Sequence, residues 1–121
     1  MDIRKLQKIV VNALEDIKGK DIEVINTTKL TSMFDRLVIA TGDSNRQVKA
    51  LAQNVQDKVR EAGGEVLSTE GENTGEWVLV DLGDIVVHVM QPTVRQYYNL
   101  EELWQATPAQ RRKAAEQAAS E

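Results

Sequence analysis

The chain has 121 residues, a formal net charge of −4, 28% charged residues and only 4% aromatic residues. This length suits one domain with a mainly aliphatic core. The absence of cysteine and the single histidine exclude disulfides, thiolate metal ligands, cysteine nucleophiles and a histidine-based metal cluster within one chain. A charged N-terminal stretch and the lack of a long apolar run predict a cytoplasmic protein with neither signal peptide nor membrane span. The net charge argues against non-specific nucleic-acid binding as the main activity.

The first part of the chain predicts a helix followed by two strands. Apolar residues recur at three- and four-residue spacing over residues 2–18, which is typical of an amphipathic helix, and Gly19 is expected to end it. Alternating residues over 21–27 predict a strand. The apolar run within residues 35–41 predicts a second strand that is buried on both faces.

A second helix follows, and its start carries a specific signal. Ser44 and Gln47 fit a capping box, in which each side chain satisfies a backbone N–H group at the helix start. The glycines at 63–64 are expected to end the helix. Residues 65–69 then predict a short strand.

Residues 76–90 are two runs rich in β-branched residues on either side of Gly83-Asp84, which is typical of a hairpin with a two-residue turn. Opposed residues in such a pair share a face. One face then carries Leu82 with Ile85, Val80 with Val87, and Val78 with Val89. The other carries Trp77 with Met90, Leu79 with His88, and Asp81 with Val86. The first face is aliphatic and predicts core, whereas the second is mixed and suits contact with another molecule.

After the hairpin, Pro92 marks a break and Thr93 is the expected N-cap of a final helix. One side of that helix would carry Tyr97, Leu100 and Trp104. We therefore expect one domain over residues 1–104, followed by a flexible Ala- and Gln-rich extension over 105–121. The order αββαβββα predicts an α/β fold with a mixed β-sheet of about five strands flanked by helices.

The charges are distributed unevenly. No Lys or Arg lies between Arg60 and Arg95, and the acids in that interval are Glu61, Glu65, Glu70, Glu72, Glu76, Asp81 and Asp84. The hairpin lies in this acidic stretch and close to most of the aromatic residues. A basic partner protein with aromatic anchors at the interface is one interpretation. The alternative is that acidic loops simply keep a small domain in solution.

Residues with possible catalytic chemistry give weaker signals. Ser44, His88 and Asp81 could form a triad, but Ser44 is explained by its cap and no G-x-S-x-G turn surrounds it. Asp81 and Asp84 could bind a divalent metal, although turn positions explain both. The helix start after residues 42–44 could bind phosphate, but it includes an aspartate. His88 between apolar neighbours is typical of a half-buried histidine, with a pH switch as the alternative.

Several blocks carry a family resemblance. They are residues 35–48, residues 71–73, residues 77–90, and the ending formed by Tyr97, Tyr98, Leu100, Glu101, Leu103 and Trp104. In this order and at this spacing they resemble the ribosomal silencing factor family (RsfS, also called iojap or YbeB-like). The likeness covers about residues 3–104.

This resemblance implies a non-enzymatic repressor of translation with a nucleotidyltransferase-like fold that lacks the metal-binding carboxylates. Family members bind ribosomal protein L14 on the large ribosomal subunit, block joining of the small subunit when nutrients are short, and form homodimers when free. By position, the candidate L14-binding residues are Trp77, Leu79, Asp81, Asp84, His88, Tyr97, Tyr98 and Trp104, with Gly83 in the turn. No cofactor, metal, catalytic residue, membrane or sequence-specific nucleic acid is expected. The alternative is a nucleotide-binding or nucleotidyltransferase-like enzyme.

Overall fold

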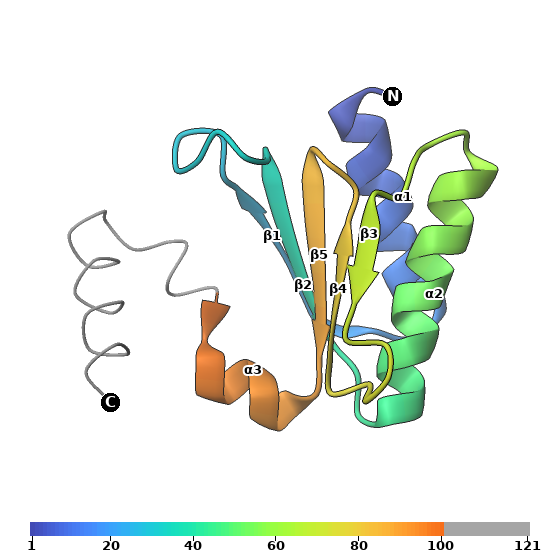
Figure 1. Ribbon diagram of the computed structural model, residues 1–121, viewed down its shortest axis with the longest axis vertical. Coiled ribbons are helices and arrows are strands. Elements are labelled where there is room, and N and C mark those ends of the chain that lie inside the picture. Colours follow the sequence, from blue (N-terminus) through green and yellow to red (C-terminus); the bar gives the residue numbers. More distant parts are fainter. Residues whose placement is uncertain (101–121) are drawn as a thin grey trace.

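A computed structural model describes residues 1–100, which form a twisted β-sheet with helices on it (Figure 1). The elements are α1 (Ile3–Asp16), β1 (Lys20–Asn26), β2 (Arg36–Thr41), α2 (Asn45–Glu61), β3 (Ser68–Glu70), β4 (Trp77–Asp81), β5 (Ile85–Met90) and α3 (Pro92–Tyr98). The predicted order αββαβββα and the mixed five-stranded sheet are confirmed.

The strands lie in the order β1-β2-β5-β4-β3. Strands β2 and β5 run parallel at the centre, and the other neighbours are antiparallel. The four central residues of β2, Leu37 to Ala40, have no exposed surface, which confirms that this strand is buried on both faces. The carboxyl ends of β2 and β5 meet at one end of the sheet, where α2 and α3 begin.

Helices α1 and α2 cover one face of the sheet (Figure 1). Their buried stripes consist of Leu6, Val10, Ala13 and Leu14 on α1, and of Val48, Leu51, Ala52, Val55 and Val59 on α2. Each fully buried Val or Leu side chain in these stripes stabilises the fold by about 1.5–3 kcal/mol. The sheet residues beneath them include Val78, Val80, Val87 and Val89, the aliphatic face predicted for the hairpin.

The hairpin has the predicted register. Trp77 pairs with Met90, Leu79 with His88, and Asp81 with Val86. The backbone N–H of Leu82 donates to the Ile85 carbonyl at 2.9 Å, which closes a two-residue turn. Gly83 has φ +89°, a conformation that glycine adopts without a steric penalty, and its N–H donates to Asp81 Oδ1 at 2.8 Å.

At the start of α2 the predicted Ser44 cap is confirmed, but the Gln47 side chain bonds a different backbone N–H group than the capping box predicts. Ser44 Oγ accepts a hydrogen bond from the Gln47 backbone N–H at 3.1 Å, as predicted. The Gln47 side chain, however, accepts from the Asp43 N–H at 2.7 Å, one residue before the cap. Its Nε2 donates to the carbonyls of Ile17 and Lys18, both at 3.2 Å, and so joins the end of α1 to the start of α2.

Two local predictions were wrong in detail. The third strand is formed by Ser68–Glu70 rather than by residues 65–69, because these three residues are the ones in regular register with β4. Thr93 is not the cap of α3, since the helix begins at Pro92, with Gln91 in the cap position and no side-chain cap. Pro at the first helical position needs no N–H partner, which explains the earlier start.

The last helix is also shorter than predicted. Helix α3 ends at Tyr98 because Asn99 takes the left-handed conformation at φ 48°. Leu100 therefore lies beyond the helix and packs against the second face of the sheet. Trp104 and the expected extension over residues 105–121 lie outside the described residues.

Two glycines offer a matched test of the loop that precedes β4. At Gly71, with φ +86°, a Cβ would lie 2.0 Å from the carbonyl oxygen of Trp77, whereas Gly63, with φ +87°, has nothing within 4 Å. Both alanine variants incur about 1–2 kcal/mol for the left-handed backbone. Gly71→Ala adds a backbone clash and is expected to lower the free energy of unfolding by at least about 3 kcal/mol in urea titrations. Equal losses in Gly71→Ala and Gly63→Ala would contradict this account.

Candidate functional site

The second face of the sheet carries the predicted site residues. Ile25, Leu37, Ile39 and Met90 form a small core there, and Val94 of α3 and Leu100 pack against it. Trp77, Leu79 and Asp81 lie beside this core along β4, all half-buried. Figure 1 shows α3 at one end of this face, away from the layer formed by α1 and α2.

Trp77 is the centre of an aromatic cluster formed by Trp77, His88, Tyr97 and Tyr98. The indole Nε1 donates a hydrogen bond to His88 Nδ1 at 2.9 Å. The Tyr98 ring lies 4.8 Å from the indole between centroids, tilted by 46°, and Tyr97 meets Tyr98 edge-on at 5.1 Å. Tyr97 and Tyr98 are 80% and 53% exposed, so the cluster extends from the strands of the sheet to the solvent-exposed surface.

His88 is held as a neutral acceptor. Burial lowers the pKa of His88 from its usual 6.5 to about 4. An indole N–H can only donate, so Nδ1 must accept and the ring proton lies on Nε2. This predicted site residue is therefore an internal partner of Trp77, and a pKa this low does not suit a switch near neutral pH.

Acidic side chains lie on β3, on β4 and at the hairpin turn. Asp81 is half-buried and fixes the turn through Gly83, whereas Asp84 lies exposed at the turn itself. Glu70 on β3 stands directly opposite Leu79 and was not among the predicted site residues. The predicted strand ended at residue 69 and so left Glu70 out. Its place on this face follows from the pairing of Glu70 with Leu79 in β3 and β4.

The residues considered for catalysis are not brought together. Ser44 caps α2 beyond the carboxyl end of β2, whereas Asp81 lies beside the hairpin turn at the opposite end of the sheet, and His88 is bonded to Trp77. Within residues 1–100 no group of three His, Cys, Asp or Glu side chains could hold a metal ion. None of the described helices is both long and apolar enough to cross a membrane.

The start of α2 is likewise engaged by the chain itself. Ser44 Oγ accepts the Gln47 N–H, and the Gln47 side chain accepts the N–H of Asp43 just before the helix. Asp43 also forms an ion pair with Lys20 at 2.5 Å. The hydrogen bond to Asp43 raises the pKa of Lys20, which keeps this amine charged. A phosphate at this helix start would have to displace these contacts.

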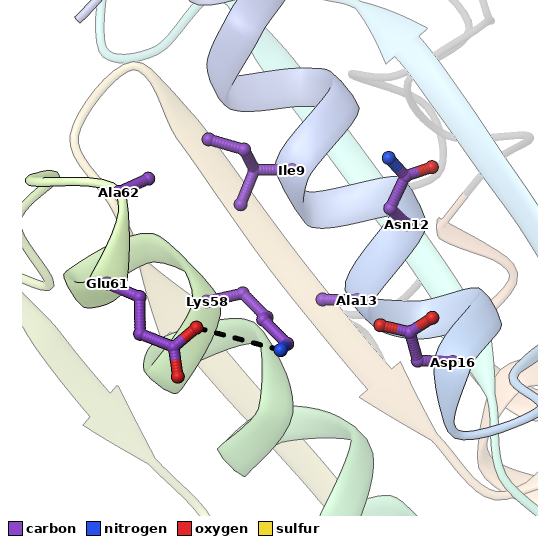
Figure 2. Close-up of a pocket in the computed structure, with 7 residues that line it drawn as sticks. All are labelled: Ile9, Asn12, Ala13, Asp16, Lys58, Glu61 and Ala62. Carbon is purple, nitrogen blue, oxygen red and sulfur yellow. Dashed lines mark ion pairs between the residues drawn. The ribbon is translucent and has the colours of Figure 1, made fainter.

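A shallow groove of about 350 Å³ lies on the far side of the molecule, between α1 and α2 (Figure 2). It is lined by Ile9, Asn12, Ala13, Asp16, Lys58, Glu61 and Ala62. The Lys58 ammonium lies 3.6 Å from the Glu61 carboxylate, so the charge on that wall is internally paired. The groove contains none of the predicted site residues.

Comparison with known proteins identifies the family to which this chain is related. The family model described as "Ribosomal silencing factor during starvation" matches residues 1–121. The chain belongs to the ribosomal silencing factor family. A ribosomal silencing factor of Chromobacterium violaceum is 61% identical over 104 residues, which cover 86% of this chain and 85% of the relative. One from Bacillus subtilis is 39% identical over 108 residues, covering 89% and 92%.

Solved structures agree with this membership. A crystal structure of a protein from Chromobacterium violaceum superposes with a TM-score of 0.86 at 59% identity, covering 88% of this chain and 89% of that one. The family resemblance and the α/β fold expected from the sequence are therefore confirmed. The family is one of ribosome silencing factors and is not a known enzyme family.

The pKa of His88 predicts a dependence of stability on pH. The folded chain, with a pKa of about 4, binds this proton less readily than the unfolded chain, with a pKa of 6.5. The contribution of His88 is thus fully present above pH 6.5 and is lost as the pH falls toward 4, because unfolding takes up a proton there. Between about pH 6.5 and pH 5, this term lowers the free energy of unfolding by at most about 1.4 kcal/mol per pH unit.

Urea titrations of the natural chain and of His88→Asn across this window isolate the term. The asparagine cannot titrate but offers an oxygen near the position of Nδ1. The natural chain is expected to lose more stability than the variant on acidification. Parallel pH profiles would show that His88 does not carry a lowered pKa.

Proposed function

We propose that this chain represses translation by binding ribosomal protein L14 on the large ribosomal subunit and blocking the joining of the small subunit when nutrients are short. The repressor acts in the cytoplasm and forms a homodimer when free. Its binding domain spans residues 1–104, and residues 105–121 lie outside this domain. Family membership supports association with the ribosome. Binding to L14 and the block of subunit joining extend this association to a specific partner and a steric mechanism.

The observation that carries the proposal is the aromatic cluster on the sheet face that α1 and α2 leave uncovered. Binding energy in protein interfaces is concentrated in a few residues, and Trp and Tyr are the commonest of them. Trp77 and Tyr98 are in ring contact, and Tyr98 is 53% exposed. They form an amphipathic platform beside the half-buried aliphatic side chain of Leu79.

Charge supports a basic partner. Glu70 stands opposite Leu79, Asp81 lies two residues farther along β4, and Asp84 lies at the hairpin turn. No Lys or Arg occurs between residues 60 and 95. Ribosomal proteins are typically basic, and complementary charge accelerates encounter and rejects wrong partners. Steric blocking needs occupancy of the right surface and no bond chemistry, so an interface of ordinary size is sufficient.

Loss of the indole should weaken binding selectively. Trp77→Ala removes the centre of the cluster and is expected to weaken binding to purified L14 and co-sedimentation with large subunits by about thirtyfold. Asp81→Asn retains an acceptor for the Gly83 N–H but removes the charge, and about a threefold loss is expected. Asp16→Asn, in the groove between α1 and α2, is the charge-matched control and should bind normally. Undiminished binding by both site variants would remove this face from the proposal.

Blocking of subunit joining is tested separately. Light scattering of mixed large and small subunits should show less joined ribosome when the natural chain is added first. Trp77→Ala should fail to inhibit at the same concentration, because it does not occupy the large subunit. A chain that binds large subunits tightly yet leaves joining unchanged would refute the steric mechanism while retaining the partner.

A further inference from the structure

His88 and Trp77 are diagonal neighbours on one face of the hairpin. The register places Trp77 opposite Met90 and Leu79 opposite His88, so the indole reaches the imidazole two residues away from its own partner along β5. The two rings lie 5.8 Å apart with a 45° tilt, and the Nε1–Nδ1 distance is 2.9 Å. A side chain with two rotatable torsions is thereby fixed at its far end as well as at its backbone.

The indole has two ring partners, His88 and Tyr98. The indole meets His88 through its N–H and Tyr98 through its ring, 4.8 Å between centroids. Tyr98 belongs to α3, which Arg95 ties to the sheet through a 2.8 Å hydrogen bond to Thr41 Oγ1. His88 itself lies in a strand, half-buried, with Leu79 and Ile39 as its neighbours on β4 and β2.

We propose that His88 is a positioning residue, whose Nδ1 fixes the indole of Trp77 in the orientation that the partner protein recognises. The inference rests on the proposed function in treating Trp77 as a partner contact. It differs from the expectation that His88 itself contacts L14, because the imidazole acts through the indole. Orientation before binding matters because a side chain that is already ordered loses less conformational entropy in the complex.

Substitutions at His88 distinguish a positioning role from mere packing. His88→Leu fills similar space but has no acceptor, so the indole N–H is left without its partner. His88→Asn places Oδ1 where Nδ1 was and restores an acceptor. Binding of His88→Leu to purified L14 and to large subunits is expected to be about three- to tenfold weaker, the usual effect of one hydrogen bond. His88→Asn should return to within about twofold of the natural chain.

Repeating His88→Leu in a chain that carries Trp77→Phe tests whether the loss of binding depends on the indole. Trp77→Phe keeps a ring but has no N–H, so His88→Leu should cause no further loss of binding when added to it. If His88→Leu weakens binding equally in both backgrounds, the imidazole acts directly and the inference is wrong. It is also wrong if His88→Leu binds normally, or if His88→Asn fails to restore binding.

Spectroscopy of the free chain reports on the environment of the Trp77 indole. A role of His88 in packing alone would leave this signal unchanged. In a Trp104→Phe background, Trp77 is the remaining tryptophan. His88→Leu should alter its near-ultraviolet circular dichroism and emission maximum, whereas His88→Asn should not. An unchanged indole spectrum in His88→Leu would overturn the inference. Normal binding by both Trp77→Ala and Asp81→Asn would instead remove this sheet face from the proposed function, so the two failures are distinguishable.

Discussion

The turn at Gly83-Asp84 is the constraint on which the rest of the structure depends. A turn of two residues fixes which side chains of β4 and β5 share a face, and a shift by one residue would exchange the core and the site. The Asp84 carbonyl also accepts the N–H groups of Asp35 and Arg36, at 2.8 and 3.1 Å, and so aligns the start of β2 with β5. One short turn thereby sets the register at the centre of the sheet.

Local signals predicted most of the fold because they are strong and short-range. The alternation around Gly83 gave the hairpin register, and Ser44 with Gln47 gave the start of α2. Prediction failed where long-range pairing decides. Residues 65–67 have suitable strand composition, but the ladder along β4 begins at Ser68. At α3, the helix begins at Pro92 rather than after Thr93, because proline is favoured at the first helical position, where its missing N–H needs no partner.

The site was predicted as a set of residues but not as an arrangement. Alternation placed Trp77 and His88 on one face, yet their hydrogen bond depends on rotamers that no sequence pattern specifies. Tyr98 comes from a separate element, and its contact with Trp77 requires the path of the chain after β5. The family resemblance named these residues together, and the geometry assigns them different roles. Trp77 and Tyr98 form the platform, and His88 supports it from the strand.

Helix α3 has only seven residues, too few to be stable on its own. Arg95 bonds the buried Thr41 hydroxyl, and Gln91 bonds the Asn45 side chain and, at 3.3 Å, the Gly75 carbonyl. The thermodynamic signature of association should reflect these anchors. If the tyrosines enter the complex already ordered, the heat capacity change should match the area buried between rigid surfaces, without the larger decrease that accompanies folding upon binding.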